Sequence, residues 1–264
     1  MKKYKGTHEF GDVYLGTEAI RDDGVGNFES VLYTPQAIAF FAAVEGGGDT
    51  LTVLEKRAVN NLVIDINTPY SGNLEYSDAI YPFVGGTSTS CKWNLVDPNT
   101  YPITWSGGMT FSSQGILGNA SDSGGDTGLN PVTLTYASMS MECYVNDGLV
   151  ATPSNWYDLG AYDGVNESIL SLGINDKVNS SVNYSASGGG INDANSSYSN
   201  SWISGLCGFV AAPNNRTTFK QDDVDFTDDD ITQTFTPADE NIGIGCRFDG
   251  TIADSSGRGL GIVA

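Results

Sequence analysis

The feature that most constrains the fold is a change of hydrophobic period near residue 81 of this 264-residue chain. Between residues 34 and 66, apolar residues recur at spacings of three and four, which is the period of an amphipathic helix. After residue 81, apolar and polar residues alternate in short segments bounded by Gly, Asn, Asp and Pro, which indicates strands joined by turns. With 33 glycines in the composition, the sequence predicts a mainly β protein with one short helical part.

The N-terminal third divides into two predicted segments. Residues 1–33 are expected to form a short β segment, with "HEFGDVYLGTEAI" and "NFESVLY" separated by the turn-rich "RDDGVGN". Residues 34–78 are expected to form a helical pair. Thr34 as N-cap, Pro35 at the first helical position and Gly46 as a stop predict the first helix over 37–45.

The second helix is predicted to begin after a cap at Asp49 or Thr50. Its apolar residues lie on one face of the helix at spacings of three and four. This predicted face consists of Leu51, Leu54, Ala58, Leu62 and Ile66.

Residues 79–264 are predicted to form a sandwich of short strands, as in a jelly roll. The predicted strands are 90–95, 101–106, 132–145, 156–162, 168–174, 178–186, 202–211, 216–220, 231–236, 241–248 and 258–263. Hairpin turns are expected at "IND" (174–176) and at "PNN" (213–215). The Ser, Gly and Asn tract at 185–201 is expected to be a long surface loop.

The stretch "AIYPFVGGTSTSCKWNL" at 79–95 is predicted to be the junction at which the helices meet the sandwich. Ile80 and Phe83 are expected to pack, Pro82 to stop the helix, and Gly85 and Gly86 to allow the turn into the first strand.

The same residues carry a resemblance to a known family. The string from "EKRAVNNLV" through "AIYPFVGGTSTSCKWNLVDP" to "WSGGMTFSSQGILGN" resembles tailed-phage virion proteins that contain a concanavalin A-like, laminin-G-like domain. Weaker similarities occur at "YDLGAYDG", "GFVAAPNNRTTFKQDD" and "NIGIGCRFDG". The resemblance implies a concanavalin-like jelly roll at 79–264, preceded by the β segment and the helical pair.

The formal net charge of −20 favours some partners and excludes others. It repels nucleic acid and anionic membrane, and leaves cations or neutral polymers such as glycans. A repulsive acidic surface that serves solubility is the simpler explanation. No transmembrane span is evident, and "MKKYKGTHEF" lacks the apolar region of a signal peptide, so Sec export is not expected.

The four cysteines are Cys91, Cys143, Cys207 and Cys246, and they lie far apart in apolar, strand-like contexts. This pattern predicts four buried, reduced thiols rather than a disulfide framework or a zinc site.

The acidic run "QDDVDFTDDD" at 221–230 suggests two kinds of chemistry. Clustered carboxylates repel one another unless solvent or a cation separates them, so calcium is the functional hypothesis and a solvated acidic turn the commoner explanation. The calcium candidates are Asp222, Asp223, Asp225, Asp228 and Asp230. A retaining glycosidase pair is disfavoured, because Asp223 and Asp225 would lie about 7 Å apart along a strand.

Aromatic residues at loop ends could form a sugar-stacking platform, although burial between the sheets is the more frequent role of such residues. The aromatic residues considered are Tyr101, Trp105, Trp156, Tyr157, Tyr162, Tyr198 and Trp202. The glycan-contact candidates are Tyr198, Trp202, Trp156, Asn192 and Asp193. The only histidine is His8, near the N-terminus, so no histidine base or triad is expected in the body and no enzyme is predicted.

The resulting expectation is a non-enzymatic virion protein, assembled in the host cytoplasm as a fibre, spike or decoration. Its expected partners are other virion proteins, a host-surface glycan or receptor, and further copies of itself, without nucleic acid or membrane insertion. A glycan depolymerase on the same fold and a purely structural cement protein of the capsid or tail are the alternatives.

Overall fold

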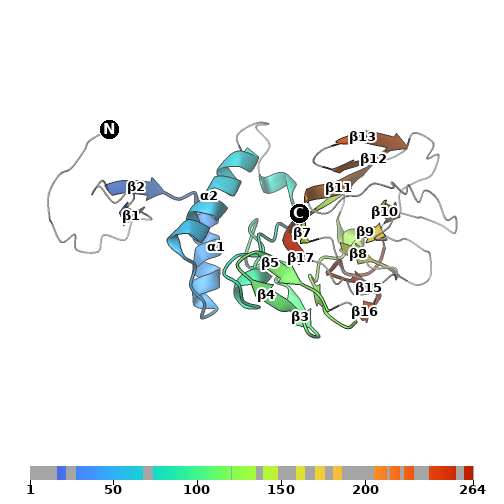
Figure 1. Ribbon diagram of the computed structural model, residues 1–264, viewed down its shortest axis with the longest axis horizontal. Coiled ribbons are helices and arrows are strands. Elements are labelled where there is room, and N and C mark those ends of the chain that lie inside the picture. The colour runs from blue at the N-terminus through green and yellow to red at the C-terminus, as the bar shows by residue number, and fades with distance from the viewer. Residues whose placement is uncertain are drawn as a thin grey trace.

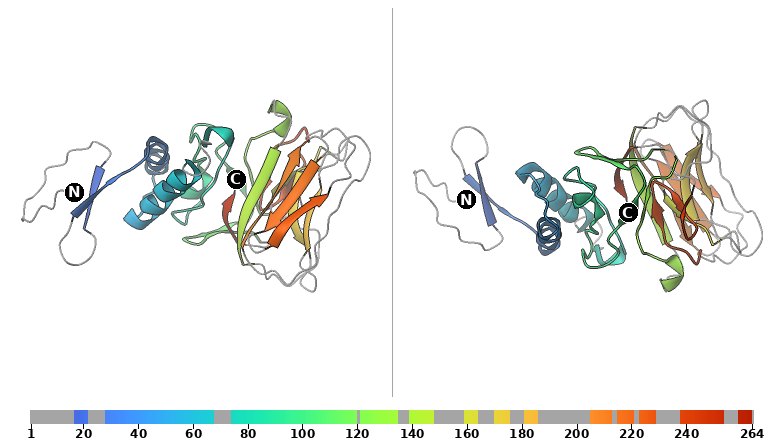
Figure 2. Two further views of the ribbon diagram at one scale, coloured as in Figure 1. Left: turned by 90° about the horizontal axis from the view of Figure 1, so that it is seen from above. Right: turned by 90° about the horizontal axis from the view of Figure 1, so that it is seen from below.

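The computed structural model describes residues 17–21, 28–67, 74–119, 121–134, 139–147, 159–163, 170–175, 181–185, 205–212, 215–220, 223–228, 238–253 and 259–263. Figure 1 shows an N-terminal hairpin, then two helices, then a body of β-strands. The two views in Figure 2 place the irregular segment that follows the helices between them and the β body. The predicted mainly β class is confirmed.

The N-terminal elements follow the predicted order. Strand β1 (Thr17–Arg21) pairs antiparallel with β2 (Phe28–Leu32). Helix α1 (Pro35–Gly46) follows, and the Thr34 hydroxyl accepts a hydrogen bond from the Ala37 N–H at 3.3 Å. The predicted N-cap is confirmed, but the helix ends later than predicted, because Gly46 is its last residue and Gly47 is the C-cap.

Helix α2 (Val53–Asn67) starts later than predicted. Its cap is neither Asp49 nor Thr50. The Thr52 hydroxyl accepts a hydrogen bond from the Glu55 N–H at 3.3 Å, and the Glu55 carboxylate accepts from the Thr52 N–H at 2.7 Å. This reciprocal pair is a capping box, which satisfies two donors at the helix start.

The predicted apolar face of α2 is also wrong in part. Leu54 is 73% exposed, and the buried positions are Val59, Asn60 and Val63. Asn60 faces inward because its side-chain oxygen accepts a hydrogen bond from the Thr34 N–H at 2.7 Å, which joins α2 to the start of α1. A polar residue at a core position shifts the buried face away from the one that hydrophobicity alone indicates.

The β body contains two sheets, and their strands are antiparallel except for one parallel pair, β15 with β8. One sheet has the order β10-β9-β8-β14-β6-β3, with β15 and β16 attached beside β8. Its strands are β3 (Thr104–Ser106), β6 (Gly124–Asp126), β8 (Leu159–Ala161), β9 (Leu170–Asn175), β10 (Ser181–Ser185), β14 (Gly243–Ile244), β15 (Arg247–Phe248) and β16 (Ile252–Ala253).

The second sheet has the order β13-β12-β11-β7-β17-β5-β4. Its strands are β4 (Thr110–Ser112), β5 (Gly115–Leu117), β7 (Met139–Asp147), β11 (Gly205–Ala212), β12 (Asn215–Lys220), β13 (Asp223–Asp228) and β17 (Gly259–Val263). The strand pairs β9–β10 and β11–β12 are both present as predicted. The turn predicted at 174–176 is misplaced, because Ile174 and Asn175 belong to β9, and Asn215 of the turn predicted at 213–215 belongs to β12, opposite Ala212.

The predicted strands overlap observed ones except in two places. The strand expected at 231–236 lies outside the described residues. The strand expected at 90–95 is wrong, since Ser90–Lys92 forms a 3₁₀ helix. The Thr87 hydroxyl accepts from the Ser90 N–H at 3.1 Å, and the Thr87 carbonyl accepts from the Cys91 N–H at 3.0 Å, so the backbone closes a turn here instead.

Several strands were not predicted, among them the glycine-containing β6. Gly124 and Gly125 read as a turn in the sequence, but both are buried in the sheet. A Cβ atom on Gly124 would lie 2.4 Å from the Cys246 sulfur, and one on Gly125 would lie 2.5 Å from Ile103 Cγ2. Glycine is required at β6 because the neighbouring side chains approach the backbone this closely.

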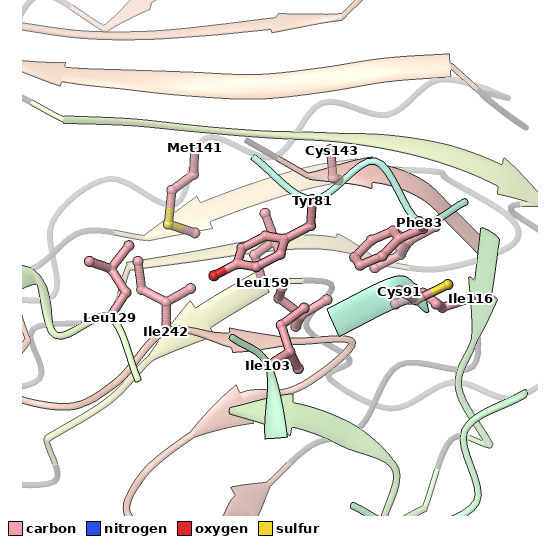
Figure 3. Close-up of a cluster of buried hydrophobic side chains, with 12 residues drawn as sticks. Tyr81, Phe83, Cys91, Ile103, Ile116, Leu129, Met141, Cys143, Leu159 and Ile242 are labelled. Atoms are coloured by element: carbon pink, nitrogen blue, oxygen red, sulfur yellow. The ribbon is translucent and has the colours of Figure 1, made fainter. Parts of the chain in front are cut away.

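Two hydrophobic clusters form the core, and the junction predicted at 79–95 contributes to both. One lies between the two sheets and includes Tyr81 and Phe83 (Figure 3). The other lies under the helices and includes Ile80 and Leu95. Because α2 ends at Asn67, Pro82 does not stop a helix as predicted. The domain boundaries at 33/34 and 78/79 stay predictions.

Asn94 holds this junction together. Its side chain is fully buried, and its oxygen accepts hydrogen bonds from the N–H groups of Ile80 and Val96, each at 3.0 Å. Its amide nitrogen donates to the Asp78 carbonyl at 3.0 Å. The Leu95 N–H donates to the Ile80 carbonyl at 2.8 Å, so two separate stretches of chain are joined side by side.

Two carboxylates from the helical part also hold the junction. The second oxygen of Glu55 accepts from the Gly85 N–H at 3.1 Å, so the capping residue of α2 also fixes the glycine turn. The Thr87 hydroxyl donates to Asp49. Gly85 has φ +84°, and a Cβ there would lie 2.6 Å from Ser90, so this position requires glycine.

We expect Asn94→Ala to lower the free energy of unfolding by about 3 kcal/mol or more, because it leaves several buried backbone groups without partners. Urea denaturation followed by circular dichroism measures the effect. Asn99→Ala is the matched control, because Asn99 is exposed and its side chain donates only to nearby Asp97. Equal stabilities of the two variants would contradict the role given to Asn94.

Candidate functional site

The glycan-contact candidates lie outside the described residues. These are Trp156, Asn192, Asp193, Tyr198 and Trp202. Asp222 and Asp230 of the calcium hypothesis lie there too, as do Tyr157 and His8. These assignments stay predictions.

Within the acidic run at 221–230, residues 223–228 do not form the turn that the simpler explanation required. Asp223–Asp228 forms β13, at one edge of the seven-stranded sheet. In the register with β12, Asp223 is opposite Lys220 and Asp228 is opposite Arg216. Opposite charges at facing positions stabilise a strand pair, which explains how an acidic segment can form a strand.

This placement limits the calcium hypothesis. Asp223 and Asp228 are separated by five steps of β13, which is about 16–17 Å of extended chain. Calcium ligands lie about 2.3–2.6 Å from the ion, so these two residues cannot hold the same ion. A single site that uses all five predicted aspartates is therefore excluded, and a smaller set around Asp222, Asp223 and Asp225 stays a prediction.

Two of the aromatic residues considered, Trp105 and Tyr101, pack against the core between the sheets. Trp105 contacts Phe83 and Phe111 with ring centroids 6.1 and 5.2 Å apart, and its indole N–H donates to the Ser88 carbonyl at 3.0 Å. Tyr101 is half-buried, and its carbonyl accepts from the Tyr81 hydroxyl at 2.7 Å. Both residues stabilise the junction.

A shallow, open hollow of about 490 Å³ lies between α1 and the loop at 96–99. Its lining is mostly apolar and small, and its one ionisable side chain is Asp97. The lining residues are Pro35, Gln36, Ala39, Ala42, Ala43, Val96, Asp97, Pro98 and Asn99. No acid–base pair converges among these residues, so the hollow is suited to contact rather than to catalysis.

The surface of the helical part is unusually apolar. Of the eight large hydrophobic side chains exposed in the described residues, six lie between residues 32 and 76. They are Leu32, Ile38, Val53, Leu54, Ile64 and Tyr76. In α1 the only charged residue is Glu45, and apolar residues such as Ala39 and Ala42 reach solvent on the side away from the core. Exposed apolar surface of this kind marks a contact region.

Three of the cysteines match the prediction of buried thiols. Cys91, Cys143 and Cys246 are buried and are thiols in this structure. Burial raises the pKa of the Cys91 thiol to about 11 and that of Cys246 to about 12, so neither is a thiolate at neutral pH. Cys207 lies on β11, and its side chain is outside the described part. Among the described residues, no group of three or more His, Cys, Asp or Glu could hold a metal ion.

Two carboxylates have raised pKa values, but they lie on different parts of the chain. Burial raises the pKa of Asp78, which precedes the junction, and that of Glu142, which lies on β7. Perturbed carboxylates mark candidate functional sites. Here the cause in both is desolvation alone, without a paired acid, so they do not constitute a glycosidase pair.

Glu142 gives the stability a defined pH dependence. Because its pKa in the folded state is raised above its ordinary value of 4.5, ionisation is easier in the unfolded chain and the charge destabilises the fold as pH rises past that value. We expect Glu142→Gln to raise the melting temperature at pH 7, and the gain to disappear below about pH 4.

Thermal unfolding at several pH values measures this effect, with Asp65→Asn as the control. Asp65 is exposed on α2, so its neutralisation should give no gain that depends on burial. A loss of stability for Glu142→Gln at pH 7 would show that the charge of Glu142 is favourable in the fold.

Neither the scan of protein-family models nor the search of curated proteins returned a match for this chain. Neither described helix has the length and apolar character of a membrane span.

Proposed function

We propose that this chain is a non-enzymatic structural protein of a phage virion, a fibre, spike or decoration. In this proposal its β body is a concanavalin-like jelly roll that contacts a host-surface glycan or receptor. The observation that carries the proposal is the contrast between the two ends of the molecule. The helical end exposes apolar side chains, whereas residues 80–264 carry 20 acidic and 6 basic residues.

This contrast suits a displayed protein. Residues 34–67 carry four acidic and two basic side chains, a net charge of −2, whereas residues 80–264 carry a net charge of −14. Exposed apolar side chains favour permanent contact with neighbouring chains, while a large net negative charge repels further copies. The helical end is therefore the base in this proposal, and the β body is the displayed part.

The order of the strands supports the jelly-roll assignment. The C-terminal β17 lies between β7 and β5, and β14 lies between β8 and β6. Strands far apart in sequence are therefore neighbours in both sheets, as the long crossovers of a jelly roll require. The resemblance at 79–95 supports the same assignment, because that segment joins base and body here.

The absence of enzymatic activity is part of the proposal. The depolymerase alternative needs two carboxylates that converge in one groove. Among the described residues, the carboxylates with raised pKa values are Asp78 and Glu142, which lie on separate elements. The cement alternative needs a β body without ligand.

Binding of purified full-length protein to host-surface polysaccharide tests the displayed role. We expect Tyr198→Ala with Trp202→Ala to weaken binding by tenfold or more, since a stacked aromatic contributes about 1 kcal/mol or more of binding energy. Tyr76→Ala is the matched control, because Tyr76 is an exposed aromatic of the base, 77% accessible.

Three outcomes of this assay separate the alternatives. New reducing ends in the polysaccharide would favour the depolymerase, and no binding to any host-surface fraction would favour the cement protein. Loss of binding on chelation, restored by calcium but not by magnesium, would support a calcium site in the acidic segment.

The attachment role of the N-terminal β segment, which precedes the base, can be tested separately by deletion of residues 1–33. We expect the protein of residues 34–264 to melt cooperatively, because both hydrophobic clusters lie within it. In cells infected by the phage, we expect it to be missing from purified particles, whereas the tagged full-length chain is incorporated. Mass spectrometry of the particles measures incorporation, and equal incorporation of the two chains would contradict the attachment role.

A further inference from the structure

Two of the four cysteines face each other across neighbouring strands. In the antiparallel register of β11 and β7, Cys207 is the direct partner of Cys143. These strands lie in the interior of the seven-stranded sheet, with β12 on one side and β17 on the other. Directly opposed residues of an antiparallel pair lie on the same face of the sheet, and Cys143 is fully buried in the core between the sheets.

The backbone spacing suits a covalent bond between them. Directly opposed residues in antiparallel strands have Cα atoms about 4.5 or 5.5 Å apart, depending on the hydrogen-bond pattern. Disulfides span Cα distances of about 4.4–6.8 Å, so both spacings lie within the range of a bridge. Opposed Cβ atoms lie about 4.5–5.5 Å apart and those of a disulfide about 3.5–4.5 Å apart, so a small approach of the two residues completes the geometry. We propose that Cys143 and Cys207 form a cross-strand disulfide when the chain folds in an oxidising thiol–disulfide buffer.

The other cysteines have no such partner in the described strands. Cys91 lies in the 3₁₀ helix Ser90–Lys92, and its thiol donates to the Val84 carbonyl at 3.5 Å. Cys246 follows β14 and lies against the glycine strand β6. The bridge should therefore be specific to one pair.

The chemistry is ordinary exchange with glutathione disulfide. The thiolate of one cysteine attacks the glutathione disulfide, forms a mixed disulfide and releases one glutathione. The thiolate of the other cysteine then displaces the second glutathione. The two protein thiols lose two electrons and two protons in total, and one glutathione disulfide is reduced to two glutathione molecules.

The position of the bridge gives it a structural effect. After β7 the chain leaves the seven-stranded sheet, forms β8, β9 and β10 in the other sheet, and returns at β11. The bond would join β7 and β11, the strands from which the chain leaves this sheet and to which it returns. It would therefore restrict the unfolded chain over a long loop. In a reducing cytoplasm the two thiols stay reduced. The bond is therefore expected only in protein that has been exposed to an oxidising medium. This inference does not depend on the proposed virion role.

Oxidative refolding of the full-length chain tests the proposal. Denatured, reduced protein is refolded in a buffer of reduced and oxidised glutathione, alkylated, and analysed by intact mass and peptide mapping. We expect one bridge, seen as the loss of two hydrogens and as a linked pair of Cys143 and Cys207 peptides, with Cys91 and Cys246 alkylated after denaturation. The bridged form should melt roughly 5–15 °C above the reduced form.

The variants provide controls. Cys91→Ala with Cys246→Ala should retain the bridge, and Cys207→Ala should lose it. Four alkylatable thiols in natively refolded protein, or a bridge that includes Cys91 or Cys246, would overturn the proposal. If Cys207→Ala does not fold, the peptide map of the unmodified chain decides alone.

Discussion

The rest of the structure depends on one buried side-chain amide, that of Asn94. A buried amide is stable only when its donors and acceptors are paired, and Asn94 meets this condition by bonding to the backbone at residues 78, 80 and 96. These bonds hold two irregular stretches of chain side by side where no sheet does so. The hydrogen bonds of the Asn94 side chain therefore replace a strand ladder between the helical part and the β body.

Once this junction is fixed, neighbouring residues can belong to different cores. Ile80 packs with the helices, whereas Tyr81 and Phe83 pack between the sheets. Phe83 has φ +43°, a left-handed conformation that is unfavourable for a residue with a large side chain. The surrounding contacts stabilise it, including the stacking of its ring with Tyr81 at a centroid distance of 6.4 Å. The helices and the sheets are coupled, because neither cluster is complete without this segment.

The sequence predicted those elements whose position depends on interactions between residues close together in the chain. Thr34 and Pro35 located α1 because a cap and a fixed φ act within one turn. The buried face of α2 was missed because the hydrogen bond of Asn60 to Thr34 depends on a contact between two helices. The strand β6 was missed for the same kind of reason, since the need for glycine there comes from side chains distant in sequence.

The acidic segment is the clearest case in which pairing overrides a local pattern. Asp-rich sequence is unfavourable in a strand, and it predicted a turn. In the sheet, Lys220 and Arg216 of β12 are opposite Asp223 and Asp228, so two of the three aspartates of β13 have a basic residue at the facing position, which the local pattern does not include. For the candidate calcium site, therefore, the sequence could identify the acidic residues but not their position on an edge strand.

The edge position of β13 also has a consequence for association. An edge strand exposes unpaired backbone groups that can pair with another copy, and inward or flanking charges are a common way to prevent this. The three aspartates of β13 place negative charge along such an edge, and every copy carries the same charge. Edge-to-edge pairing through β13 is thereby disfavoured, whereas the apolar helical end has no comparable barrier. The charge on β13 thus opposes contact between copies through this edge, as the proposed display of the β body requires.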